Sequence, residues 1–183
     1  MINAIITDFD GTLVDTFEAN FLAYQKAFAD EKLCLTKEIY RKCFGYRYEY
    51  FVSYMGIFDE CVILRIKENK LRYYPEYFTY LKPNTSLIKL IDTNHKLGVK
   101  TAIASTARKE NLMNVINYLG IKEIFDLIYA GEDVKEGKPN PEIYIKTMFE
   151  LGVEAHQTLI FEDSEVGLEA AIKSGANYLK ITL

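Results

Sequence analysis

The chain has 183 residues, which suffices for one ordinary domain or for a core domain with a small insertion. Its apolar content of 49% and charged content of 26% are typical of a soluble globular protein, and its formal net charge of -4 argues against a nucleic-acid partner. No stretch approaches the roughly 20 apolar residues of a membrane span, and Asp8 interrupts the apolar run that a leader peptide would need. We therefore expect a cytoplasmic protein that binds neither nucleic acid nor membrane.

The first predicted element is a short strand over Asn3–Asp8, whose apolar residues suit burial between two layers of helix. Asp10 follows this strand, and Gly11 then lets the chain turn sharply. In doubly wound sheets, ligands bind at the carboxyl ends of the strands. The two acids are therefore predicted to lie where chemistry takes place.

Residues two apart in a strand face the same side, so Asp8 and Asp10 can flank one reaction centre. One can act as nucleophile or metal ligand, and the other as acid and base. Two carboxylates this close repel each other unless a cation separates them, and oxygen ligands favour Mg2+. A strand-end turn with two solvated acids is one alternative. A calcium loop is another, but Thr12–Val14 offers none of the further oxygen ligands that such a loop needs.

A segment without any strand pattern follows, from about Thr16 to Leu81, and it contains 17 of the 25 Phe and Tyr residues. Aromatic residues at helical spacing predict a first helix with one apolar face; these are Phe17, Phe21, Tyr24 and Phe28. Three more helices are predicted, over Lys37–Phe44, Arg47–Met55 and Asp59–Tyr74. We interpret residues 16–81 as a helical bundle inserted into a main domain of residues 1–15 and 82–183.

Large side chains are needed to fill the core of so small a bundle, and we expect most of its aromatic residues to do this. Contact with a substrate ring is the alternative for some of four tyrosines, namely Tyr46, Tyr48, Tyr50 and Tyr54.

From Pro83 onward, predicted helices and strands alternate regularly. The helices are Asn84–Leu97, a segment from about Arg108 to Leu119, Asn140–Leu151 and a segment ending at Ser174. The strands are Val99–Ala104, Leu127–Ala130, Thr158–Phe161 and Tyr178–Thr182. With the first strand, this alternation predicts an α/β fold: a doubly wound parallel sheet of five strands with helices on both faces.

Chemically useful side chains come at the ends of three predicted strands. These are the pair Asp8 and Asp10, then Ser105, then the pair Glu162 and Asp163. Lys138 lies in the loop before a helix. Because the carboxyl ends of parallel strands meet at one edge of the sheet, we expect a single site assembled from distant parts of the sequence.

These four groups match the four motifs of the haloacid dehalogenase-like (HAD) superfamily in type, order and approximate spacing. The motifs are Asp8-Phe-Asp10-Gly-Thr, Ile103-Ala-Ser105, Lys138-Pro-Asn-Pro141 and Phe161-Glu-Asp-Ser164 with Gly167 and the pair Ala170-Ala171. The resemblance covers the whole chain. The fourth motif resembles the beta-phosphoglucomutase and phosphoglycolate phosphatase branch, in which a helical cap stands where this chain has its inserted bundle.

The resemblance implies a Mg2+-dependent phosphatase in which Asp8 attacks a phosphoryl group and forms an aspartyl-phosphate. Asp10 would protonate the leaving oxygen and then activate the water that cleaves the intermediate. Lys138 would add positive charge beside Asp8. Mg2+ would be held by Asp8, the main-chain carbonyl of Asp10, and Asp163, with Glu162 nearby.

The same resemblance assigns Ser105 and the Thr106 amide to the phosphoryl oxygens, and Arg47 of the insertion to the substrate. The expected partner is a small phosphorylated metabolite, and the protein is expected to be a monomer or small homo-oligomer. Asp10 favours phosphate chemistry over dehalogenation, because halide leaves without a proton. No lysine of the insertion matches the Schiff-base lysine of the phosphonatase branch.

Two further alternatives remain. A sugar-phosphate mutase would carry a His at the position of Asn20, and its cap arginine stands one position later than Arg47. A catalytically silent binding protein could retain the fold, but it would have no need to hold repelling carboxylates together.

Overall fold

The computed structural model describes residues 1–182, which form two compact units. The first, an α/β unit, combines Met1–Asp15 with the described chain from Pro83 onward, and the second, a helical unit, comprises Thr16–Lys82. Two-residue strands, β2 (Val14–Asp15) and β3 (Lys82–Pro83), lie where the chain leaves and re-enters the α/β unit. Sequence periodicity could not predict them, because two residues carry no pattern.

The α/β unit is built on a parallel sheet with the strand order β5-β4-β1-β6-β7. The strands are β1 (Ala4–Thr7), β4 (Lys100–Ala104), β5 (Leu127–Tyr129), β6 (Thr158–Glu162) and β7 (Asn177–Lys180). The predicted fold class, a five-stranded parallel α/β sheet, is confirmed. Thr7 of β1 pairs with Ile103 of β4 and with Phe161 of β6, so all three strands end at one level.

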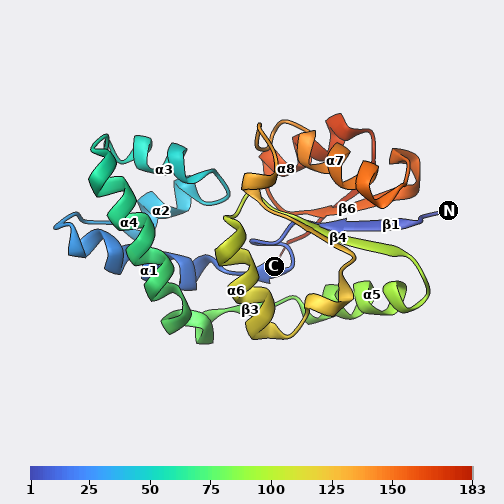
Figure 1. The fold of residues 1–183 in the computed structure, drawn as a ribbon, viewed down its shortest axis with the longest axis horizontal. Helices are drawn as coiled ribbons and strands as arrows, with labels where there is room; N and C mark the ends of the chain where they lie inside the picture. Colours follow the sequence, from blue (N-terminus) through green and yellow to red (C-terminus); the bar gives the residue numbers. More distant parts are fainter. Residues whose placement is uncertain (183) are drawn as a thin grey trace. The chain divides into compact units, whose positions relative to one another are not determined.

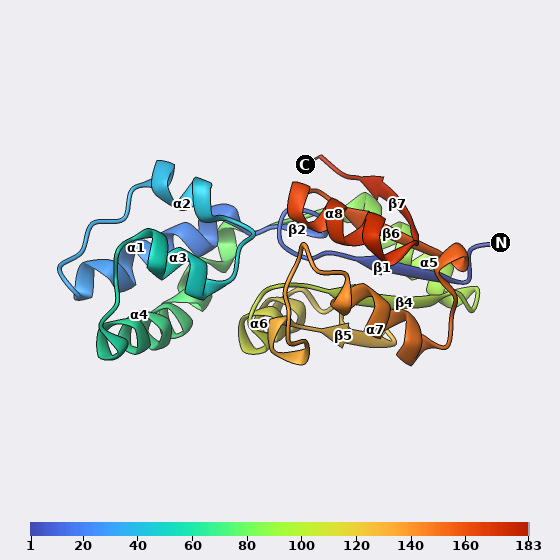
Figure 2. The same cartoon turned by 90° about the horizontal axis from the view of Figure 1, so that it is seen from above.

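Four helices cover the sheet, as Figures 1 and 2 show, with α7 and α8 on one face and α5 and α6 on the other. They are α5 (Thr85–Lys96), α6 (Lys109–Leu119), α7 (Glu142–Leu151) and α8 (Glu165–Ser174). Single-turn 3-10 segments occur at Lys122–Ile124, Gly131–Asp133 and Ala155–Gln157. One hydrophobic cluster joins the sheet to α7 and α8, and it includes Ile6, Ala104, Ile143, Met148 and Ile160.

The helical unit consists of four helices and a 3-10 segment. These are α1 (Phe17–Asp30), α2 (Lys37–Cys43), α3 (Tyr48–Tyr54), α4 (Glu60–Tyr73) and η1 (Tyr74–Tyr80). Each predicted helix is present within a residue or two of its expected bounds, the usual uncertainty at frayed ends. None of the described helices is both long enough and apolar enough to cross a membrane.

Aromatic rings fill the core of the helical unit, as composition predicted. Phe28 and Phe51 stack with centroids 5.4 Å apart, and both belong to one buried cluster with Phe21 and Tyr40. The four tyrosines with an alternative role divide into two groups. Tyr48 donates its hydroxyl to the Ile63 carbonyl at 2.7 Å. The other three are exposed, and Tyr50 of α3 stacks both with Tyr46, which precedes the helix, and with Tyr54.

Candidate active site

Asp8 directly follows β1 and is buried beside β6. The Asp8 amide donates to the Phe161 carbonyl at 2.9 Å, and the residue is only 5% exposed. Gly11 adopts φ +92°, and a Cβ there would lie 2.3 Å from Asp163 Oδ2. Glycine is therefore needed at position 11 for two reasons, the left-handed backbone and the close approach of the Asp163 carboxylate.

Strand β6 ends in Glu162, and Asp163 follows it. Glu162 is completely buried, and its Oε2 accepts hydrogen bonds from the Asp163 amide, the Ser164 amide and the Ser164 hydroxyl at 2.9, 3.0 and 3.1 Å. Asp163 is partly exposed and accepts from the Thr12 hydroxyl at 2.7 Å. The first-motif turn thus directly orients an acid of the fourth motif.

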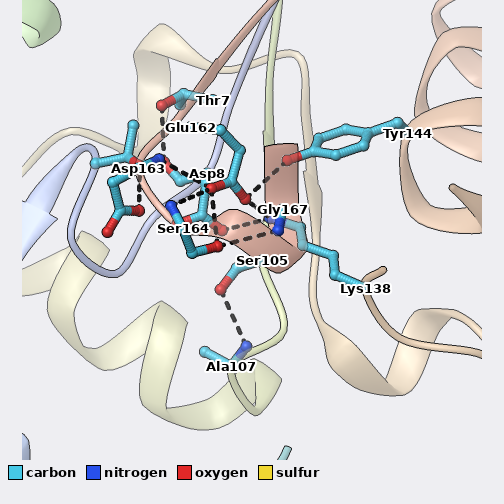
Figure 3. Close-up of polar contacts among 11 residues, drawn as sticks. Thr7, Asp8, Ser105, Ala107, Lys138, Tyr144, Glu162, Asp163, Ser164 and Gly167 are labelled. Carbon is cyan, nitrogen blue, oxygen red and sulfur yellow. Dashed lines mark hydrogen bonds and ion pairs between the residues drawn. The ribbon is translucent and has the colours of Figure 1, made fainter. Parts of the chain in front are cut away.

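Lys138 links the two groups of acids. Its Nζ lies 2.6 Å from Asp8 Oδ1 and 2.5 Å from Glu162 Oε1, and its side chain is 2% exposed. Figure 3 shows these three side chains pointing toward one another, with Tyr144 beside them. A buried cation shared by two carboxylates satisfies charges that would otherwise be costly to bury.

Electrostatics within the cluster follow from this burial. Burial opposes the charge on Lys138, but Asp8, Tyr144 and Glu162 outweigh it and hold the pKa of Lys138 well above its usual value. Burial also raises the pKa of Asp8, and the Glu162 and Asp163 charges add to that rise against the opposing effect of Lys138. The pKa of Asp163 is raised as well, chiefly by burial. The positive charge near Asp8 and Asp163 is therefore too small to offset the effect of burial on their pKa values.

Burial alone would raise the pKa of Glu162 too, but Lys138 and several hydrogen bonds hold it below its usual value. The neighbours of Glu162 therefore favour its ionised form. The ionised forms of Asp8 and Asp163 would be favoured only by a further positive charge.

One group of residues fits a metal ion within the described chain. Asp8, Glu162 and Asp163 each offer a carboxylate oxygen, and these oxygens lie within 4.8 Å of one another. An all-oxygen set suits a hard divalent cation such as Mg2+, which is commonly held by one or two carboxylates and water. The raised pKa values of two of the three acids fit the same interpretation, because a cation would favour their ionised forms.

Ser105 follows β4 and lies at the same edge of the sheet. It is 1% exposed, and its amide donates to the Tyr129 carbonyl at 3.0 Å. Its hydroxyl accepts from the Ala107 amide at 3.0 Å, which shapes the loop that carries Thr106. A Cβ at Gly131 would lie 2.6 Å from the Thr106 carbonyl oxygen, so Gly131 gives this loop its space.

The remaining predicted site residues lie in the turn after β1 and in the helical unit. Asp10 is half-buried and forms a parallel β-bridge with Val14. Arg47 directly precedes α3. The structure thus brings Asp8, Lys138, Glu162 and Asp163 into one cluster, while the contact of Arg47 with substrate stays a prediction.

Sequence reasoning missed Tyr144, which is fully buried and donates its hydroxyl to Glu162 Oε1 at 3.0 Å. No motif marks this residue; its only sequence signal is its place in the first turn of the helix after Lys138.

Gly167 belongs to the fourth motif, but the sequence does not show why a glycine is needed at that position. A Cβ at Gly167 would lie 1.8 Å from Glu162 Oε1, so the acid occupies the space of the missing side chain.

A cavity of about 360 Å³ opens beside Asp163. It is lined by Gly11, Asp15, Asp163, Lys180, Ile181 and Thr182. The metal-fitting cluster is therefore next to an open space within the α/β unit.

The profile of the haloacid dehalogenase-like hydrolase family matches residues 5–181. The chain therefore belongs to the haloacid dehalogenase-like hydrolases, and the resemblance inferred from its motifs is confirmed. The buried acids at the strand ends of this chain agree with hydrolase chemistry.

Individual relatives cover nearly the whole chain. The phosphorylated carbohydrates phosphatase of Thermotoga maritima is 29% identical over an alignment of 180 positions that covers 95% of this chain and 82% of that protein. The protein CbbY of Rhodobacter capsulatus is 30% identical over an alignment of 189 positions that again covers 95% of this chain and 82% of the relative.

Solved structures share the fold and its topology. CbbY from Rhodobacter sphaeroides, in complex with phosphate, superposes with a TM-score of 0.90 at 28% identity and covers 100% of this chain and 87% of its own. The beta-phosphoglucomutase of Clostridium difficile superposes with a TM-score of 0.83 at 25% identity, covering 100% and 86%.

Proposed function

We propose that the protein is a Mg2+-dependent phosphatase of small phosphorylated metabolites that acts through an aspartyl-phosphate on Asp8. The observation that carries the proposal is the buried contact of Lys138 with Asp8 and Glu162, beside a cluster of three acids that fits a metal. Such a site places positive charge around a carboxylate nucleophile, which is what phosphoryl transfer needs.

In the first half-reaction, an Asp8 carboxylate oxygen attacks phosphorus, and the bond from phosphorus to the substrate oxygen breaks. Asp10 gives its proton to that leaving oxygen. In the second half-reaction, water attacks the same phosphorus, Asp10 takes a proton from the water, and the bond to Asp8 breaks. Lys138 balances the charge on Asp8 throughout, while Ser105 and the Thr106 amide bind phosphoryl oxygens.

Asp8, Asp163 and Glu162 would hold Mg2+, together with the main-chain carbonyl of Asp10. The ion, when bound, supplies further positive charge against the phosphoryl oxygens. The chain's own task is to fix Asp8 and to favour its ionised form, and the Lys138 contact supports both by partly offsetting the effect of burial.

Sugar phosphates are the substrate class that we propose. The relative from Thermotoga maritima is a phosphorylated carbohydrates phosphatase, and a CbbY structure similar to this chain contains xylulose-1,5-bisphosphate. We further propose that residues 16–81 act as a cap whose Arg47 contacts the substrate, while residues 1–15 and 82–183 carry the chemistry.

Phosphate release from a panel of sugar phosphates, nucleotides, phosphoglycolate and an aryl phosphate tests the proposal, with Mg2+ or EDTA. We expect Mg2+-dependent release that Asp8→Asn abolishes. Asp92→Asn, which removes a surface acid of α5 paired with Lys96, is the matched control and should retain activity. Conversion of glucose-1-phosphate to its 6-phosphate without release would favour a mutase. Silence on every substrate, in a folded protein, would favour a binding protein.

A further inference from the structure

Tyr144 is a buried tyrosine whose hydroxyl faces the proposed active site. It lies in the first turn of α7, it has no exposed surface, and it donates to Glu162 Oε1 at 3.0 Å. A buried hydroxyl needs a partner, but a backbone carbonyl would serve as well. The partner here is one of the proposed metal ligands, so the hydroxyl is part of the same hydrogen-bond network.

Glu162 Oε1 is shared by two donors. Lys138 Nζ approaches it to 2.5 Å and approaches Asp8 Oδ1 to 2.6 Å. The same Nζ lies 4.9 Å from the centroid of the Tyr144 ring. Lys138 is therefore held between two carboxylates and an aromatic face, and Tyr144 contributes to its position through the ring, through a hydrogen bond between its hydroxyl and Lys138, and through Glu162.

The Glu162 carboxylate has no freedom to adjust. Its other oxygen, Oε2, accepts three hydrogen bonds from Asp163 and Ser164, and α8 approaches so closely that a Cβ at Gly167 would lie 1.8 Å from Oε1. If one donor to Oε1 is removed, we therefore expect Lys138 to move rather than Glu162, because the lysine side chain is longer and more flexible.

We propose that Tyr144 is a positioning residue that keeps Lys138 directed at Asp8. An acceptor oxygen with two donors holds each of them less strongly than an oxygen with one, because each donor reduces the negative charge that attracts the other. The Tyr144 hydroxyl thereby weakens the attraction of Glu162 for Lys138, and more of the ammonium charge remains for Asp8. This inference rests on the proposed function, since it concerns the support of the nucleophile.

Tyr144→Phe removes the hydroxyl and keeps the ring, and Tyr129→Phe is its matched control. Tyr129 lies on β5 in the same unit, and the Nζ of Lys146 is 4.9 Å from its ring centroid, the distance that Lys138 has to Tyr144. The Tyr129 hydroxyl bonds to Glu150 in the last turn of α7, and its carbonyl bond to Ser105 is untouched by the substitution. Both variants retain the aromatic ring and its packing.

The measurements are phosphate-release kinetics on the best substrate and calorimetric binding of orthovanadate in the presence of Mg2+. For Tyr144→Phe we expect kcat to fall about tenfold with KM changed less than about twofold, and orthovanadate Kd to rise about tenfold at unchanged stoichiometry. Tyr129→Phe should match the wild type. A variant that was merely partly unfolded would lower the stoichiometry and leave Kd unchanged.

Three outcomes would overturn the inference. An active wild type with a Tyr144→Phe variant of equal kcat and equal orthovanadate Kd would overturn it and leave the proposed function intact. Equal losses in Tyr144→Phe and Tyr129→Phe would show a general effect of removing a tyrosine hydroxyl from this unit. A wild type that neither releases phosphate nor binds orthovanadate would overturn the proposed function and this inference with it.

Discussion

At the scale of single residues, Gly167 is required by an acid rather than by a turn. It lies in the first turn of α8, an ordinary helical position where alanine would normally be preferred by about 1 kcal/mol. The space of its side chain is taken by the Glu162 carboxylate, with Oε1 at 1.8 Å and Cδ at 2.0 Å from where a Cβ would lie. The position of the Glu162 carboxylate therefore depends on glycine at position 167.

Gly167→Ala should displace the Glu162 carboxylate, because neither helix nor strand backbone can move apart easily. We expect a loss of about 1–3 kcal/mol in the free energy of unfolding, the usual cost of overpacking, and a large loss of Mg2+ affinity. Urea unfolding and titration calorimetry with Mg2+ measure the two effects.

Gly98→Ala is the control for this substitution. Gly98 has φ +88°, and a Cβ there would meet open space, so the cost of the substitution is backbone strain alone, about 1 kcal/mol, with Mg2+ affinity unchanged. Wild-type Mg2+ affinity in Gly167→Ala would contradict the interpretation of position 167.

At the scale of elements, the start of α8 is tied to the site through one side chain. The Ser164 hydroxyl accepts from the Gly167 amide at 3.1 Å and donates to Glu162 Oε2 at 3.1 Å. It is thus both the N-cap of a helix and a hydrogen-bond donor to a proposed metal ligand. Thr36, the N-cap of α2, accepts from the Ile39 amide at 3.2 Å in the same way, but it belongs to the helical unit, which holds none of the clustered acids.

Ser164→Ala and Thr36→Ala should therefore differ in function more than in stability. Each loses a cap worth about 1 kcal/mol in the free energy of unfolding. Only Ser164→Ala also removes a donor from the buried Glu162, so we expect it alone to lower kcat and Mg2+ affinity. Thermal unfolding and phosphate release on both variants provide the comparison, and equal kcat in the two would argue against a role of Ser164 beyond capping.

The elements also show what the sequence could predict. Strands β1, β4 and β6 were predictable because each is a short apolar run that ends in polar residues, and the helices because of their 3.6-residue periodicity and caps. The helix after Lys138 was expected from Asn140, whereas α7 begins at Glu142, whose amide donates to Asn140 Oδ1 at 2.9 Å. Asn140 was the expected N-cap with Pro141 at the first helical position, but Pro141 is the N-cap of α7 and makes no side-chain cap hydrogen bond, so the expected cap was wrong and the boundary was one residue off.

For the site, the acids and Lys138 were predictable because charged groups at strand ends converge in any parallel sheet. Tyr144 was not, since its hydroxyl reaches Glu162 only through the packing of α7 against the sheet. The need for glycine at position 131 was not predictable either, because it arises from the Thr106 carbonyl, which is 25 residues away in sequence.

At the scale of the whole molecule, each unit has a hydrophobic core of its own. The core of the α/β unit is largely aliphatic and joins the sheet to α7 and α8, whereas the core of the helical unit is largely aromatic. The acids that fit a metal all belong to the α/β unit, which is assembled from both ends of the sequence. A metal ion would therefore tie together β1 and β6, which are distant along the chain.

Metal binding should for this reason stabilise the fold in a pH-dependent way. Burial raises the pKa of Asp8 and of Asp163 above their usual values, so without a metal the folded protein loses stability as pH rises from the unfolded pKa through the folded one. Mg2+ binds the ionised carboxylates and offsets this cost. Its stabilising effect should thus be fully present above the raised pKa values and fade on acidification, beginning at a higher pH than for an ordinary Asp of pKa about 3.9.

The measurement is the melting temperature with Mg2+ or EDTA at several pH values, from neutral pH down to about 4, the usual carboxyl pKa. At neutral pH and a hundredfold excess over Kd, Mg2+ should add about 2.7 kcal/mol to the free energy of unfolding. Asp163→Asn should lose most of this gain because it removes a ligand, whereas Asp92→Asn on the surface of α5 should keep it. A Mg2+ shift that is absent, or that survives unchanged in Asp163→Asn, would mean that these carboxylates do not bind the ion. A shift that did not diminish toward acid pH would mean that protons and Mg2+ do not compete for Asp8.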